Sequence, residues 1–538
     1  MNPFRLGLLA PLALLLSAQT VPDPQVIGFP SEVVEAHRLS GSTTIAVPAA
    51  KLQGYAGQVG IRVTIDTGGK VTDARAEDRS GDFDPAPAIA AARQWTFRPF
   101  AYRGRPVAAM ADLQVYYRFE PAWADPQAAF PAIDYATLRI ELTRGACYGP
   151  CPVYRVSITG DGTVTYASGV KEDGAGAVHQ LFNPNGALVA GVHRAKIDRA
   201  ALDGLIEQFR AARFFGLKKA YEASITDNPA YTLRFSTGGQ AMEVIDYVGQ
   251  MVDMPEAVTA LEKEVDRVSG SARWVKGDAT TLPALLAEGF DPRSPAAADL
   301  ALGAHGSDGD ALVLGLLAAG MPLDRMVRSG YPPKAEQLGL KLLEGTLRRG
   351  QPRLALALIE RGWLAKMPAA RRAALFAETA GGCDPAVAKA MIAAGVDPNA
   401  RMPANEDFGY LNGGSTALHV ARAPYACSDL ADRGPLVRAL ITLGTDPDAR
   451  DAEGETVIYG VGDPDLLAAL LASGVRADVK NKKGNSPAFS SWSDLIVLTL
   501  LEAGADPHGK DEGKTLPVTA KEHAMPATSA WLAAHDIR

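Results

Sequence analysis

The residues best suited to chemistry in this sequence are four cysteines: Cys147, Cys151, Cys383 and Cys427. An even number of cysteines is typical of exported proteins that are held by disulfides. The simplest pairing is local and joins Cys147 to Cys151. It likewise joins Cys383 to Cys427, which would tie down the insertion that lies between them. Four cysteines allow three connectivities, and the sequence alone does not choose between them.

Cys147 and Cys151 could instead form a redox pair. The motif that lowers the pKa of a redox thiol is normally Cys-x-x-Cys at the N-terminus of a helix. Here three residues separate the cysteines, and Pro150 and Pro152 indicate that the loop does not open a helix. A structural disulfide, or two buried thiols, is the favoured interpretation. A thiol-redox protein stays as an alternative function.

The sequence contains no recognisable enzyme or cofactor motif. Its eight histidines are scattered, and it lacks His-Glu-x-x-His, Gly-x-Ser-x-Gly and Walker sequences. No histidine near the cysteines completes a metal-ligand set. We therefore expect a protein that is not an enzyme and that holds no metal or cofactor.

Charge and the N-terminus predict where the protein works. The formal net charge is −7 and no Lys/Arg tract is present, which excludes nucleic acid as a partner. Residues 1–20 have the pattern of a signal peptide: Arg5, an apolar core from Leu6 to Leu16, then small residues. That core is too short to span a bilayer, which takes about 20 residues. We expect a periplasmic or secreted protein with no stable membrane insertion after cleavage; an uncleaved anchor is the alternative.

The elements of a first domain, residues 45–120, follow from its hydrophobic pattern. Val59, Ile61, Val63 and Ile65 alternate with polar residues, as in a half-buried strand. Thr67 to Lys70 has the composition of a hairpin turn, and a second strand follows it. A short alanine-rich helix over 85–94 and a strand over 113–119 complete the predicted order: strand, strand, helix, strand.

This first domain resembles the C-terminal domain of TonB. The resemblance rests on Gly57-Gln58-Val59, on the segment from Ala91 to Pro99 (Ala-Ala-Arg-Gln-Trp-Thr-Phe-Arg-Pro) and on Gly104 to Val107. It implies an envelope protein that contacts other proteins. Energy transduction by TonB proteins also needs a membrane anchor and a long proline-rich spacer, but only the short segment 21–44 separates the predicted signal from this domain. A TonB-like energy-transducing or receptor-contacting protein is thus an alternative function.

A middle α+β domain is predicted over residues 133–270. Strands are expected over 138–142, 153–159 and 163–166, and Asp198 is a plausible N-cap of the helix that follows. The motifs Cys147-x-Gly149-x-Cys151-Pro152-x-Tyr154 and Thr226-Asp227-x-Pro229 resemble a family of exported domains of unknown function. The resemblance implies no particular activity.

The remaining half of the chain contains an internal repeat. Seven apolar helices each end at a glycine: Gly289, Gly320, Gly362, Gly395, Gly444, Gly474 and Gly504. The last three of these glycines follow one another at equal intervals, and both these intervals and the one from Gly362 to Gly395 fit the ankyrin period of about 33 residues. Thr416-Ala417-Leu418-His419-Val420-Ala421 resembles the Thr-Pro-Leu-His-x-Ala signature of ankyrin repeats.

The resemblance assigns roles to these residues and predicts an ankyrin-repeat α-solenoid over 272–538. Thr416 starts an inner helix and bonds His419, Leu418 fills the core between repeats, and Ala421 lets helices approach. An insertion between Gly395 and Gly444 carries Phe408, Tyr410 and Leu411, aromatic and apolar residues that suit a protein interface. The alternative is that these three pack on their own repeat. We expect two small α+β domains and a solenoid that serve as a protein-binding scaffold.

Overall fold

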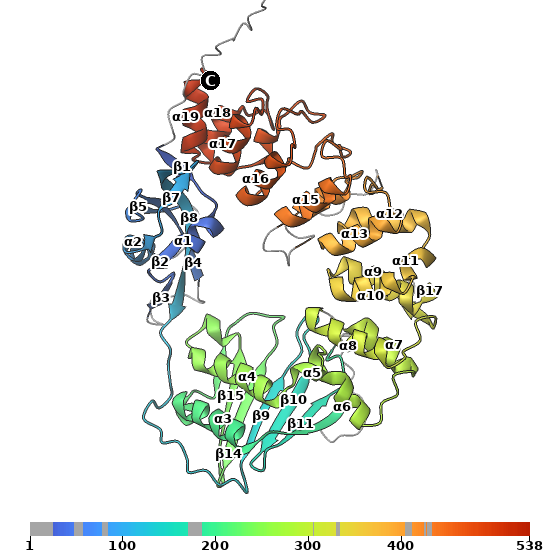
Figure 1. The fold of residues 1–538 in the computed structure, drawn as a ribbon. Coiled ribbons are helices and arrows are strands. Elements are labelled where there is room, and N and C mark those ends of the chain that lie inside the picture. The colour runs from blue at the N-terminus through green and yellow to red at the C-terminus, as the bar shows by residue number, and fades with distance from the viewer. Residues whose placement is uncertain are drawn as a thin grey trace, which may run out of the picture.

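The computed structural model shows a β-rich first half followed by a helical second half (Figure 1). It describes residues 25–47, 57–77, 84–169, 186–304, 306–329, 334–403, 411–423, 427 and 433–538. The predicted signal peptide, residues 1–20, lies outside these ranges. Within them, no helix is long and apolar enough to cross a membrane. The chain follows a closed course in which the last helices return to the first domain (Figure 1).

The first domain is built around one long strand, β8 (Arg105–Phe119). β4 (Gly57–Ile65) pairs antiparallel with β8, and β5 (Val71–Ala76) pairs antiparallel with β4. Two short strands, β1 (Val26–Gly28) and β3 (Thr44–Val47), run parallel to β8. The other elements are α1 (Ser31–His37), β2 (Arg38–Ser40), α2 (Ala86–Ala92), β6 (Thr96–Phe97) and β7 (Phe100–Tyr102). The expected strand, strand, helix, strand order is present, and β1 and β3 extend the sheet.

Local sequence explains the hairpin between β4 and β5. The Asp66 carboxylate accepts hydrogen bonds from the backbone N–H groups of Gly68 and Lys70, both at 2.9 Å. Gly69 adopts a φ of 86°, which a glycine accommodates without strain. The alternating side chains of β4 that begin at Val59 are fully buried beneath this turn.

The middle domain is a mainly antiparallel sheet covered by two helices; only the edge strand β13 runs parallel to its neighbour, β15, among the described strands. Among the described residues the sheet has seven strands, in the order β12-β11-β10-β9-β14-β15-β13. Their bounds are β9 (Arg139–Arg144), β10 (Tyr154–Thr159), β11 (Thr163–Ser168), β12 (Gly191–Lys196), β13 (Ala220–Glu222), β14 (Tyr231–Thr237) and β15 (Gln240–Tyr247). The covering helices are α3 (Arg199–Ala211) and α4 (Glu256–Ser269). Asp198 caps α3 as predicted, because its side chain accepts the Ala201 N–H at 2.8 Å.

The second half consists mainly of consecutive short helices that form an arc (Figure 1). They are α5 (Ala272–Val275), α6 (Thr281–Ala287), α7 (Pro295–Gly303), α8 (Gly306–Ala318), α9 (Leu338–Arg348), α10 (Pro352–Glu360), α11 (Trp363–Lys366), α12 (Ala369–Thr379), α13 (Pro385–Ala393), α14 (Ala417–Arg422), α15 (Gly434–Thr442), α16 (Pro464–Ala472), α17 (Asp494–Glu502), α18 (Leu516–Glu522) and α19 (Pro526–Ala534). A hairpin of β16 (Met326–Ser329) and β17 (Lys334–Gln337) interrupts them. After Thr456 the chain forms turns, and after Ser486 it forms a short 3₁₀ helix, η4 (Pro487–Ser490).

The seven glycines predicted to end helices all do so in the left-handed conformation. Their φ values lie between 80° and 102°. At Gly474, for example, the glycine N–H donates to Leu471 O at 3.0 Å and the next N–H, of Val475, donates to Leu470 O at 3.1 Å. This pair of bonds closes the end of a helix and turns the chain sharply. The same pair of bonds recurs at Gly504, the next glycine of the series.

A buried histidine joins two of these helical segments. Thr416 precedes α14, and its backbone N–H donates to Nδ1 of His419 at 3.3 Å. The other ring nitrogen, Nε2, lies 3.1 Å from the carbonyl oxygen of Glu455 in the next segment. Burial, followed by the nearby Arg422, lowers the pKa of His419 to about 4. A neutral imidazole therefore links the two segments.

The last helices close the course of the chain by docking on the first domain, in a contact that we call the clasp. Asp494, the first residue of α17, is 3% exposed, and its carboxylate accepts the Gly28 N–H of β1 at 2.9 Å. It also accepts the N–H groups of Ala527 and Thr528 at the start of α19, at 3.0 and 2.7 Å. One carboxylate thereby holds together β1, α17 and α19.

The clasp has an apolar part and a second polar contact. Leu495 and Leu498 of α17 lie in the same hydrophobic core as Ile27 of β1. At the far end of α17, Glu502 accepts a hydrogen bond from the Tyr102 hydroxyl and pairs with Arg103 at 2.6 Å. Burial, and then Glu502, raises the pKa of Tyr102 to about 12, so the phenol stays a donor at neutral pH.

Candidate functional site

Of the three residues predicted to contact a partner, the structure describes only Leu411. Phe408 and Tyr410 lie outside the described residues. Leu411 is only 4% exposed and packs in the hydrophobic core of the helical half. For Leu411 the structure therefore favours the alternative of packing within its own segment, because a buried side chain cannot contact a partner.

The cysteines form the two local disulfides. Cys147 is bonded to Cys151, with a Cα–Cα distance of 5.6 Å, in the loop between β9 and β10. Cys383 is bonded to Cys427 across 44 positions of sequence, with a Cα–Cα distance of 5.5 Å. The second disulfide fixes the segment before α13 to the one before α15.

The motifs noted in the middle domain meet at one end of its sheet. The Tyr148 N–H, inside the disulfide loop, donates to Asp227 O at 3.2 Å. The N–H of Gly145, just before that loop, donates to Ala230 O at 2.8 Å. The disulfide loop and the Thr226–Pro229 segment therefore lie side by side. Tyr148 itself is 76% exposed at this end of the domain.

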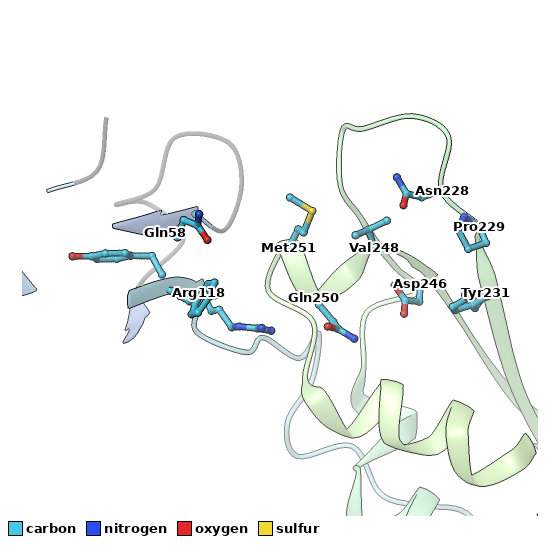
Figure 2. A pocket seen from close by; sticks show the side chains of 12 residues that line it. Gln58, Arg118, Asn228, Pro229, Tyr231, Asp246, Val248, Gln250 and Met251 are labelled. Atoms are coloured by element: carbon cyan, nitrogen blue, oxygen red, sulfur yellow. The ribbon is translucent and has the colours of Figure 1, made fainter. Parts of the chain in front are cut away.

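Beside these loops lies a cavity of about 520 Å³ between the first and middle domains, which we call the interdomain pocket (Figure 2). One wall comes from the first domain and the other from β14, β15 and the turn after β15. The lining residues are Gly57, Gln58, Tyr116, Tyr117, Arg118, Asn228, Pro229, Tyr231, Asp246, Val248, Gln250 and Met251. The segment that joins the two domains is bonded to the middle domain, where the Ala122 N–H donates to Asp253 O at 2.9 Å.

A strained turn forms one edge of the interdomain pocket. Val248 adopts a φ of 53°, which is rare for a β-branched residue and costs about 1–3 kcal/mol. The turn is held because the Asp246 carboxylate accepts the Gly249 N–H at 2.6 Å. A Cβ on Gly249 would lie 2.6 Å from the sulfur of Met254 and 2.9 Å from the Cβ of Tyr221, so a larger residue there would have to displace buried side chains. The next residues form a short 3₁₀ helix, η3 (Gly249–Met251), which faces the first domain.

A network of buried polar groups lies behind the Tyr231 wall of the pocket. The Arg144 guanidinium is 4.3 Å from the centre of the Tyr231 ring and donates to Asp266 at 2.6 and 2.9 Å. Tyr154, the last residue of the cysteine motif, donates to the other Asp266 oxygen at 2.8 Å. Burial alone would lower the pKa of Arg144, but Asp266 and Tyr154 raise it above its ordinary value. Arg144 is therefore a fixed cation that orients Tyr231.

Two carboxyl groups share a buried position beside this network. Glu262 of α4 is 2% exposed, and burial followed by the nearby Asp246 raises its pKa to about 8. At neutral pH Glu262 is therefore mostly protonated and can hydrogen-bond the Asp246 carboxylate. Burial also raises the pKa of Asp246. The pair supports the turn at Val248 from inside the domain.

Arg118, near the end of β8, is the remaining charged group of the pocket. Its side chain extends from the first domain toward Gln250 (Figure 2). No hydrogen-bond or ion-pair partner of its guanidinium exists among the residues that the structure describes. The same part of the chain holds no cluster of ligands for a metal ion. The arrangement is suited to recognition of an anionic group.

Arg118, Arg144, Asp246 and Glu262 were not predicted from the sequence. One signal was available: Glu262 lies at helical spacing from Val258, Leu261 and Val265, on the buried face of α4. A charged residue on an apolar stripe indicates a buried polar cluster. No such sequence pattern distinguishes Arg118 from the other arginines.

Comparison with protein families bears on both N-terminal domains. Residues 48–119 match the family model of the Gram-negative bacterial TonB protein C-terminal domain. The first domain is TonB-like. Residues 138–269 match a domain of unknown function, DUF6438. Both resemblances are thereby confirmed. A TonB-like domain together with disulfides indicates a protein of the bacterial envelope.

The helical half has no such match. No ankyrin-repeat family is detected over it. No curated protein matches the chain. Over its described residues, this half is mainly a series of short helices, many of which end at a glycine.

Proposed function

We propose that this protein is a non-enzymatic scaffold of the bacterial periplasm that binds a partner protein through its C-terminal half. In this proposal residues 272–538 are a divergent ankyrin-type α-solenoid. The observation that supports it best is a turn whose hydrogen bonds recur in the next segment, at an interval close to the ankyrin period of about 33 residues.

The repeated turn is centred on Asp451 and on Asn481. The Asp451 side chain accepts the N–H groups of Glu453 and Glu455, both at 2.9 Å. In the next segment the Asn481 side chain accepts the N–H groups two and four positions on, at 3.1 and 3.0 Å. The two turns are spaced as Gly444 and Gly474 are, and equal contacts at equal spacing are typical of stacked repeats.

Successive turns are bonded to each other and form a row. The Lys482 N–H donates to Glu453 O at 2.9 Å, and Arg450 reaches Lys480 O at 2.7 Å. The side chains at the tips of the turns, including Glu453 and Lys483, are exposed. A rigid row of exposed charged residues, which we call the turn row, is suited to protein binding without catalysis.

A photo-crosslinking amino acid placed at Lys483 tests this proposal in the full chain. The matched control carries it at Lys389, which is exposed on α13, outside the turn row. We expect one specific crosslinked protein from the Lys483 position and none from Lys389. Equal crosslinking from both positions, or none from either, would contradict a binding role for the turn row.

A second function, contact with an envelope receptor, is favoured by the TonB-like domain. Among the described residues, β5 pairs only with β4, so an extended peptide could add to its outer edge. Crosslinking from Asp73, which is exposed on β5, would capture a receptor in that case. The mass of the mature N-terminus is the companion measurement: a chain that starts near Gln19 has lost its anchor and cannot transduce energy across the envelope.

A further inference from the structure

We infer that the interdomain pocket binds a short peptide through the peptide's free C-terminal carboxylate. The site lies between the TonB-like and middle domains and is separate from the turn row proposed to bind a protein. The charge, the hydrogen-bonding groups and the shape of the pocket all suit such a ligand.

Charge indicates an anion with a single negative charge. Arg118 has no partner for its guanidinium among the described residues, and a half-buried guanidinium pairs best with a planar, two-pronged anion. The other charged lining residue, Asp246, already accepts the Gly249 N–H at 2.6 Å. One arginine balances one carboxylate. A phosphate group, which carries up to two charges, would be left partly uncompensated.

The neutral lining matches a peptide. Gln58, Asn228 and Gln250 carry amide groups that both donate and accept, as peptide groups do. Tyr116, which is 42% exposed, and Met251 offer apolar surface for a side chain. The cavity of about 520 Å³ lies within the range of small-ligand sites.

The pocket wall on the middle domain is preorganised. The strained turn at Val248 is held by Asp246, and Tyr231 is held against Arg144. Strained backbone of this kind is concentrated at ligand-binding sites. Because these groups are fixed before a ligand arrives, little ordering is needed on binding.

Isothermal titration calorimetry on the full chain tests the inference. The probes are the tripeptide Ala-Phe-Ala with a free carboxylate, the same tripeptide as its C-terminal amide, and inorganic phosphate. The variants are Arg118→Gln, Arg118→Lys and the control Arg93→Gln, which changes an exposed arginine at the end of α2. Far-ultraviolet circular dichroism establishes that each variant is folded.

We expect the acid to bind the parent protein and Arg93→Gln equally, and the amide to bind at least tenfold more weakly. Arg118→Gln should bind the acid more weakly than the parent protein does, by the same factor. Arg118→Lys should fall between the two, because it keeps the charge but not the two-pronged geometry. Equal binding of acid and amide, unchanged binding by Arg118→Gln, or no binding of either peptide at millimolar concentration would overturn the inference. Binding of phosphate alone would also overturn it.

Discussion

Replacing Gly28 with alanine should open the clasp between the first domain and the last helices. A Cβ at this position would lie 2.9 Å from the Cβ of Asp494, closer than real Cβ contacts come. Asp494 begins α17 and its carboxylate is held by two further backbone groups of α19, so it cannot move aside without breaking those bonds. The substitution therefore acts on the contact between domains rather than on the interior of either one.

The size of the effect follows from the packing. Forcing one extra methyl group into a filled site costs about 1–3 kcal/mol. If that cost is relieved by opening, the ratio of closed to open molecules falls by roughly 5- to 150-fold. The matched control is Gly60→Ala on β4 of the same domain, where the nearest atom to a new Cβ is Glu77 Oε2 at 3.4 Å, an ordinary contact.

Small-angle X-ray scattering and amide hydrogen exchange measure the opening. Gly28→Ala should increase the radius of gyration and speed exchange in α17 and α19, while Gly60→Ala should behave as the parent protein does. Glu502→Gln, which weakens the contact with Tyr102 and Arg103, should act in the same direction more mildly, since its Arg103 pair is largely exposed. If the two glycine variants give the same scattering and exchange, the clasp does not hold the closed form.

Three further expectations concern stability. Removing the Cys383–Cys427 disulfide by serine substitution should lower the free energy of unfolding, measured in urea, by about 4 kcal/mol. Removing the Cys147–Cys151 disulfide should lower it by only about 2 kcal/mol, because the loops closed span 44 and 4 positions. Equal losses would refute this. Glu262 has a pKa of about 8 when folded and an ordinary value of 4.5, so stability should fall as pH rises from about 5 to 8, by up to about 1.4 kcal/mol per unit. Glu262→Gln should remove that slope, and an unchanged slope would exclude Glu262 as its source. Gly474→Ala should lower the free energy of unfolding by about 1 kcal/mol, because Gly474 has a φ of 86°. Gly462 is exposed and lies outside the left-handed region, so Gly462→Ala should change the free energy of unfolding by no more than about 0.5 kcal/mol.

Local patterns in the sequence predicted the local elements. The alternation that begins at Val59 predicts β4, Asp198 predicts the start of α3, and regularly spaced glycines such as Gly474 predict the ends of helices. Each of these depends on neighbours within a few residues. No full helix follows Thr456 or Ser486, because nearby glycine and proline residues leave only a few positions for one.

The clasp and the interdomain pocket could not be predicted in the same way. The hydrogen bond from Gly28 to Asp494 spans 466 positions of sequence, and no local pattern at either residue predicts it. The pocket likewise combines Arg118 with the turn around Val248, which are far apart in sequence. An arginine becomes a candidate binding group only when its surroundings leave it without a partner. That condition depends on tertiary structure and not on residue type.

One strand connects the clasp to the pocket. β1 pairs with β8 at Ala108 to Met110, while Tyr116 to Arg118 of the same strand line the pocket. At about 3.3 Å per residue the two places lie roughly 25 Å apart on a single continuous strand. Opening the clasp frees one end of the first domain to rotate, and its other end is a wall of the pocket. Gly28→Ala should therefore also weaken binding of the free-carboxylate peptide, although no pocket residue has changed. If scattering shows that the variant is open and its affinity for the peptide is unchanged, the pocket walls are held together without the clasp.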